Sequence, residues 1–190
     1  MSEYSTAPVP MTAEQKFFFD LQGWILLPSV LSEAEIEAMK AEVYGGAKQG
    51  YQGVLQELLD HPAVVGILTE ILAEEPYLGD EHYSFRCENS FTTVRHAGWK
   101  STDNGTGLPH VVRPPQQANA MRYQVAGNKI FSGLTRVVWE LEEVKAGQGG
   151  TTFLSCSHKA HFNYGGPDPN PAQYRRIALG GTHAGGHGPV

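Results

Sequence analysis

The sequence predicts an α+β fold in which helices come first and antiparallel strands follow. Two observations carry this prediction. Amphipathic segments with helix-capping residues occupy roughly residues 12–76, and from about residue 80 strand-forming residues dominate, with an alternating segment over 129–144. This order favours N-terminal helices packed on a β-sandwich or barrel. A chain of 190 residues, 41% of them hydrophobic, is expected to form one domain.

The first helix is predicted to begin at Thr12, because Gln15 completes a capping box with it, and to end at Gly23. Three residues are assigned to its apolar face: Phe17, Phe18 and Leu21. Residues 24–27 are predicted to form a short buried strand. The stretch that precedes the helix, residues 1–11, is predicted to be a flexible arm.

The second helix is predicted to begin with another capping box, formed by Ser32 and Glu35, and to stop at Gly45-Gly46. The third is expected to start near Pro62, since a missing N–H costs nothing at the first helical position. Its buried face is assigned to four residues: Val64, Leu68, Ile71 and Leu72.

The second half of the chain is predicted to form strands over 82–94, 129–144 and 151–154, the last two being a hairpin. Four residues of the alternating segment are expected to face inward: Thr135, Val137, Trp139 and Leu141. Residues 97–118 form a long polar connection, and loops of this length are usually functional or mobile. The glycine-rich residues 166–190 are predicted to be a weakly ordered tail.

Charge and hydropathy argue against two classes of partner. The net charge is −6, whereas a dedicated nucleic-acid binder would carry a basic face. No apolar run approaches the roughly 18 residues of a membrane span. The N-terminus lacks a basic and an apolar region, which predicts a cytoplasmic protein. Cys87 and Cys156 form no CxxC pair, so free thiols are expected.

Candidate chemical residues are found mainly among eight histidines. His110 closes the long connection, just before the strongest strand, but no H-x-D, H-x-E or H-E-x-x-H pattern accompanies it. A lone histidine is more often a hydrogen-bonded structural residue than a ligand, so both interpretations stay open. Glu140 and Glu142 lie on one face of a predicted strand. They could serve as acid and base, although a solvated strand edge is the preferred interpretation.

Two segments, taken together, resemble the phytanoyl-CoA dioxygenase family. Residues 17–36, which read FFFDLQGWILLPSVLSEAEI, resemble the N-terminal helix, Gly-aromatic strand and acidic helix of that family. Residues 137–144 (VVWELEEV) and 149–159 (GGTTFLSCSHK) resemble its strand, glycine-rich turn and Gly-Ser-His-Lys motif, with Cys156 in place of the usual glycine. The resemblance covers about residues 12–165, as one domain, and it is specific only in combination.

The resemblance implies a double-stranded β-helix, which is a jelly-roll or cupin-like barrel, and non-heme Fe(II) held by two histidines and one carboxylate. It implies 2-oxoglutarate as co-substrate and hydroxylation of an unidentified small molecule. His110 is placed as the first iron ligand, and Trp139 matches a tryptophan near 2-oxoglutarate. Val112 stands at the carboxylate position, which leaves a different carboxylate, a vacant position or no iron. The histidine of Ser157-His158-Lys159 is interpreted as structural or rim-forming.

The family's second histidine and its 2-oxoglutarate arginine follow far beyond this motif. After Lys159 the chain offers four candidates, in the reverse of the family's order: Arg175, Arg176, His183 and His187. A C-terminally shortened member with an incomplete barrel is therefore expected. Its alternative function is that of an inactive remnant that binds a small molecule or a protein, and its open sheet edge favours a homo-oligomer. A halogenase-like variant is a third alternative, suggested only by Val112.

Overall fold

The computed structural model describes residues 8–48, 50, 52–72, 85–96, 98, 123–145, 151–153, 155–159 and 175–176. Its elements are, in order, α1 (Ala13–Gln22), α2 (Glu33–Tyr44), the 3-10 helix η1 (Gly53–Leu58), α3 (Pro62–Leu72), β1 (Tyr123–Ala126), β2 (Lys129–Ser132), β3 (Thr152–Phe153), the 3-10 helix η4 (Ser157–Lys159) and β4 (Arg175–Arg176). Helices precede strands, and both strand pairs are antiparallel. The double-stranded β-helix stays a prediction.

Both predicted capping boxes are present. The Gln15 amide donates to Thr12 Oγ1 at 3.1 Å, and the Thr12 amide donates to Gln15 Oε1 at 2.9 Å. Ser32 and Glu35 form the same reciprocal pair at the start of α2. Gly23 ends α1 in the left-handed conformation, with φ 83°. These boundaries follow from hydrogen bonds between residues three or four apart, which the sequence specifies locally.

The buried face predicted for α1 is wrong. Phe19 is the buried phenylalanine, with 7% of its surface exposed, whereas Phe17 is 62% exposed, and Phe18 and Leu21 are exposed as well. Phe17, Phe18 and Phe19 are consecutive, and each residue advances about 100° around a helix, so the phenylalanine run cannot face the core as a whole. Phe19 faces it because its ring packs on Tyr123 of β1, a neighbour that no local pattern specifies.

α3 begins at Pro62 as predicted. Its buried residues extend around more of the helix than the single apolar face that was predicted. Val64 and Ile71 are buried as expected, and Val65 and Ile67 are buried in addition. The core forms where α3 meets α1, the β1–β2 hairpin and the residues before α1; it is centred on four side chains: Met11, Phe19, Ile67 and Ile71. The short helix η1, which precedes α3, was not predicted.

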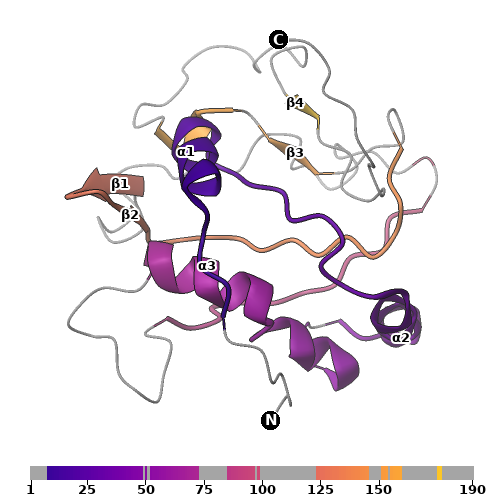
Figure 1. Ribbon diagram of the computed structural model, residues 1–190. Helices are drawn as coiled ribbons and strands as arrows, with labels where there is room; N and C mark the ends of the chain where they lie inside the picture. Colours follow the sequence, from indigo (N-terminus) through magenta and orange to yellow (C-terminus); the bar gives the residue numbers. More distant parts are fainter. Residues whose placement is uncertain are drawn as a thin grey trace.

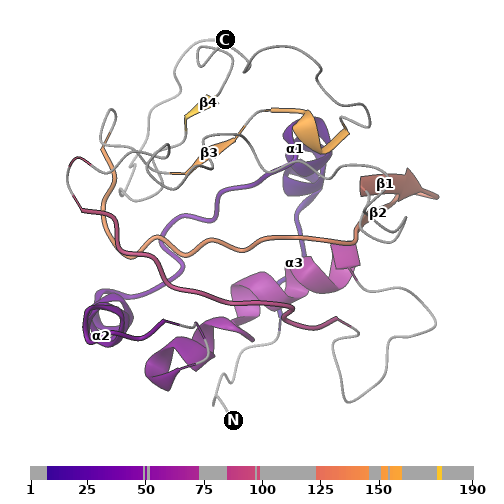
Figure 2. The ribbon, with the colours of Figure 1, turned by 180° about the vertical axis from the view of Figure 1, so that it is seen from behind.

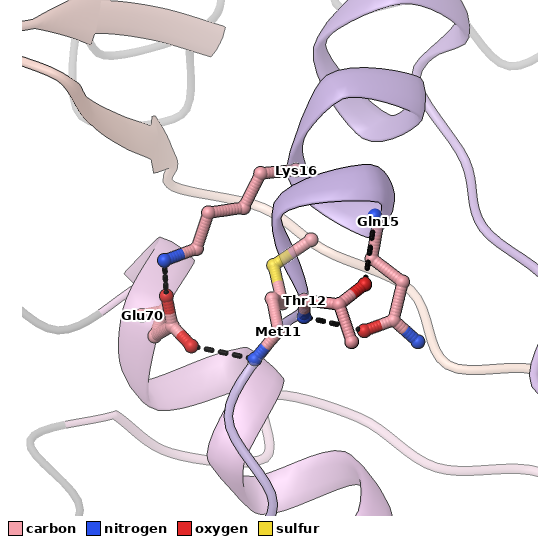
Figure 3. Close-up of polar contacts among 5 residues, drawn as sticks. All are labelled: Met11, Thr12, Gln15, Lys16 and Glu70. Carbon is pink, nitrogen blue, oxygen red and sulfur yellow. Dashed lines mark hydrogen bonds and ion pairs between the residues drawn. The ribbon is translucent and has the colours of Figure 1, made fainter.

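Residues 9–11 form a strap along α3, which we call the N-terminal strap. The Val9 amide donates to the Pro62 carbonyl at 3.1 Å, and the Met11 amide donates to Glu70 Oε1 at 2.6 Å. Lys16 of α1 pairs with the other oxygen of Glu70 at 2.5 Å, as Figure 3 shows. Part of the predicted flexible arm is therefore docked on α3; residues 1–7 lie outside the described residues.

β1 and β2 form a hairpin with Ala126 opposite Lys129. The two residues between them, Gly127 and Asn128, both have positive φ angles of 56° and 64°, as a type I′ turn requires. The predicted strand over 129–144 is correct for 129–132 only, since residues 133–145 join no ladder within the described part of the chain. In Figures 1 and 2 this orange segment crosses the molecule between α3 and β3.

The other strand predictions also need correction. β3 pairs with β4, so the hairpin predicted between 129–144 and 151–154 is wrong. The described part of the predicted strand 82–94, and residues 24–27, form neither helix nor strand and have no ladder partner among the described residues. Leu26, placed in a buried strand, is exposed. Of the predicted tail, the structure describes only Arg175–Arg176, which form β4.

Candidate functional site

Of the two residues assigned a cofactor role, the structure describes Trp139 and does not describe His110. His110, the predicted iron ligand, lies outside the described residues, as do Val112, His183 and His187. Trp139 is described and half-buried in the extended segment 133–145. Its predicted place beside 2-oxoglutarate therefore stays a prediction, and its contacts within the fold are known.

Trp139 packs on a buried histidine that sequence reasoning missed. The rings of Trp139 and His61 lie edge to face with centroids 5.4 Å apart. His61 directly precedes α3: its carbonyl accepts from the Val64 and Val65 amides, and its Nδ1 accepts from the Ala63 amide at 3.2 Å. Because Nδ1 accepts, a neutral His61 carries its proton on Nε2. A histidine directly before Pro62 was the local signal that could have identified this helix cap.

A second polar cluster joins the end of α1 to η4, and we call it the α1 clasp. It consists of Asp20, Gly23, Tyr123, Cys156, His158 and Lys159. Its donors satisfy the last carbonyls of α1 in turn: Gly23 N to Phe19 O at 2.8 Å, His158 Nε2 to Asp20 O at 2.9 Å, Cys156 Sγ to Leu21 O at 3.1 Å, and Cys156 N to Gln22 O at 3.2 Å. A distant turn thus caps the helix, a role normally filled by adjacent residues.

Cys156 adopts a left-handed backbone with φ 66°. This conformation favours glycine over residues that carry a Cβ. A glycine at position 156 would adopt this backbone conformation without the cost that a Cβ brings. The Cys156 thiol is free and exposed, and it donates to Leu21 as described above.

The Asp20 carboxylate is held by two donors of the clasp. Tyr123 Oη lies 2.5 Å from Asp20 Oδ1, and Lys159 Nζ lies 3.1 Å from the same oxygen. The hydrogen bond from Tyr123 and then that from Lys159 lower the pKa of Asp20. Burial raises the pKa of Tyr123 above its usual range, and the hydrogen bond to the Asp20 carboxylate raises it further. Asp20 is thus ionised and Tyr123 protonated at neutral pH.

The described contacts of His158 are structural, and its interpretation as a structural or rim-forming residue stays a prediction. Its Nε2 faces a carbonyl oxygen, which only accepts, so Nε2 must donate. The other ring nitrogen, Nδ1, is buried without a hydrogen-bond partner and faces the α-carbon of Gly23, where a Cβ would overlap the ring. Burial lowers the pKa of His158, and the charge of Lys159 acts in the same direction. The ring also stands edge to face on Tyr123, with centroids 4.5 Å apart.

The described residues contain no group of three His, Cys, Asp or Glu side chains that could hold a metal ion. Glu140 and Glu142, weighed as an acid and base pair, have separate structural partners. Glu140 accepts from Thr151, and Glu142 accepts from Tyr44 and pairs with Lys40. Glu140 and Glu142 belong to no strand of the structure, so the strand face and the strand edge on which the two interpretations depended are not formed there.

No protein-family model, curated protein or solved structure matches the chain. None of the described helices is long and apolar enough to cross a membrane.

Proposed function

We propose that the chain is an Fe(II)- and 2-oxoglutarate-dependent dioxygenase of the phytanoyl-CoA dioxygenase type that hydroxylates a small molecule in the cytoplasm. One observation carries the proposal: the two segments that resemble this family, 17–36 and 137–159, meet in the α1 clasp. Trp24 of the first also stacks on Phe153 of the second, with ring centroids 6.0 Å apart. Resemblances more than 100 residues apart support one another when they pack together.

The backbone at Cys156 is a second support. A φ of 66° favours glycine, and the family's motif has glycine at that place. A glycine before Ser157-His158-Lys159, as in the family's motif, would suit this backbone conformation, which supports the proposal. In this proposal the motif is a structural part of the enzyme, and it supplies no iron ligand.

His110 is proposed as an iron ligand and Trp139 as a wall of the 2-oxoglutarate site. When bound together, iron and 2-oxoglutarate would supply oxygen activation and C–H hydroxylation. Since the described residues include no group of three ligands, the remaining ligands are not assigned, and no reaction step is assigned to a residue of the clasp. The double-stranded β-helix belongs to the same proposal.

An inactive binding module is the second candidate function. It is favoured by Val112, which cannot ligate iron at the position where the family has a carboxylate. In that case the same fold would bind a small molecule or a second chain through an open sheet edge. Nucleic acid and membrane are not proposed as partners, because the chain is acidic and has no apolar run long enough for a span.

Anaerobic titration with Fe(II) and then 2-oxoglutarate tests the proposal, with the visible charge-transfer band of the chelated complex as readout. The wild-type chain is expected to develop the band near one equivalent of iron. His110→Ala should lose it, while His96→Ala, which alters an exposed histidine, should keep it. Trp139→Phe should raise the 2-oxoglutarate concentration needed for the band without altering iron stoichiometry.

The outcomes separate the two functions. A wild-type chain that binds no iron would overturn the dioxygenase proposal and leave the binding module. A band that persists in His110→Ala would retain iron chemistry but remove His110 from the ligand set. Circular dichroism of each variant shows whether the loss reflects the site or the fold.

A further inference from the structure

We propose that residues 155–159 form a pH-gated latch on α1, which opens when His158 takes up a second proton. The latch contributes three members of the α1 clasp, Cys156, His158 and Lys159. It is independent of the proposed iron chemistry. Three donors from this turn, the Cys156 amide, the Cys156 thiol and His158 Nε2, satisfy three successive carbonyls of α1.

The geometry around His158 favours the neutral ring. Nε2 already donates its proton to the Asp20 carbonyl, so a second proton must go to Nδ1. That nitrogen is buried, has no acceptor among the described residues, and faces the α-carbon of Gly23 too closely even for a methyl group. A new N–H there would be desolvated and unpaired, which is costly for a charged ring. Protonation is therefore easier once the turn has moved away from α1.

Charged and titratable groups face His158 from each element packed on it. From α1, the hydrogen bond to the Asp20 carbonyl and, more weakly, the Asp20 carboxylate favour the protonated ring. From its own turn, Lys159 opposes it, and from β1 the Tyr123 hydroxyl is neutral. Burial is the largest influence and lowers the pKa of His158, so the attraction of Asp20 does not prevail. Asp20 stays ionised through the range in which His158 titrates, because its own pKa is lowered.

The sign of the pH dependence follows from these groups. The open state binds the proton near the ordinary histidine value of 6.5, and the closed state binds it at a lower pH. The latch is therefore fully closed above about pH 6.5 and opens progressively as the pH falls toward the pKa of closed His158. One proton is involved, so the opening equilibrium changes by at most about tenfold per pH unit.

Nuclear magnetic resonance of the full chain between about pH 7.5 and 5 tests the latch. The protection factor of the Cys156 amide, corrected for intrinsic exchange, is expected to fall by up to about tenfold per pH unit below pH 6.5. The Val65 amide, which donates to His61 in α3, should keep its protection and serves as the reference. In His158→Gln the side-chain amide replaces the Nε2 donor without titrating, so the Cys156 amide should become insensitive to pH.

Direct titration of the His158 ring in the wild-type chain keeps the proposal testable even if His158→Gln does not fold. A ring that titrates at or above the ordinary value of 6.5 would overturn the latch. So would Cys156 protection that is flat with pH, that falls equally in His158→Gln, or that falls together with Val65, since the last result indicates global unfolding.

Discussion

Gly23 is a single residue that two constraints fix independently. Its φ of 83° is left-handed, and a Cβ there would overlap the His158 ring. The sequence identified Gly23 as a helix end, because glycine after an amphipathic segment is a local signal. It could not show the second constraint, since His158 comes 135 positions later and only the folded chain brings the two together.

Gly23→Ala is expected to destabilise the protein more than an ordinary left-handed Gly→Ala change, which costs about 1–2 kcal/mol. The excess comes from displacement of the His158 ring and the loss of its bond to Asp20. Urea denaturation of both variants measures this, with Gly46→Ala as the control, because Gly46 has φ 103° and no atom within 4 Å of the added Cβ. Equal losses in the two variants would contradict the close approach of His158.

Tyr123→Phe is expected to cost about 1 kcal/mol at neutral pH, the value of a partly exposed hydrogen bond to a carboxylate. The folded pKa of Asp20 is lowered first by this bond. Its stabilisation is therefore present above the ordinary Asp value of 3.8 and lost as pH falls through the lowered value. Stability curves of wild type and Tyr123→Phe should converge below about pH 3.8; a gap that stays constant would assign the cost to packing.

At the scale of elements, prediction succeeded for helices and failed for most strands. Thr12 and Ser32 mark helix starts through bonds to residues three positions away, and Pro62 marks one because its missing N–H costs nothing at the first helical position. Strand alternation, as in 133–145, predicts only an extended backbone with two faces, whereas a ladder needs a neighbour that can lie anywhere in the chain. The exception in the structure is the β1–β2 hairpin, whose turn Gly127-Asn128 was a local signal that went unused.

The N-terminal strap reverses the effect that replacing a helical glycine by alanine usually has on stability. Gly66→Ala in α3 would ordinarily add about 1 kcal/mol of helix stability. Here the new Cβ would overlap the backbone of Val9, so the variant is expected to be less stable than wild type. The Val9 amide, which donates to Pro62, should lose exchange protection with it. A more stable variant with an intact Val9 amide would show that the strap is not seated on Gly66.

For the whole molecule, the described core is small, and each member matters. Ile71→Ala, at a side chain 2% exposed, is expected to cost about 2–5 kcal/mol, a large share of the roughly 5–15 kcal/mol of a typical domain. Phe17→Ala should change stability by less than about 0.5 kcal/mol, because Phe17 is mostly exposed. Chemical denaturation compares the two. A large loss from Phe17→Ala that grows with protein concentration would mean that a second chain covers this face.

As with the fold, some residues of the candidate site were assigned from the sequence and others were found only in the structure. His110 and Trp139 were assigned by resemblance, while His61, the residue on which Trp139 packs, was not considered. The clasp escaped prediction because its members come from three distant segments: Asp20 in α1, Tyr123 in β1, and the residues around His158. Only the interpretation of His158 as structural anticipated any part of it.

The distance along the chain between the two halves of the clasp has a consequence for synthesis. Asp20 and His158 are 138 residues apart, and ribosomes add about 5–20 residues per second. For roughly 7–30 seconds after α1 leaves the ribosome, its last carbonyls have no donors from the turn at 155–159. During most of translation the C-terminal end of α1 thus lacks these capping donors. The cap can form only after residues 155–159 have left the ribosome.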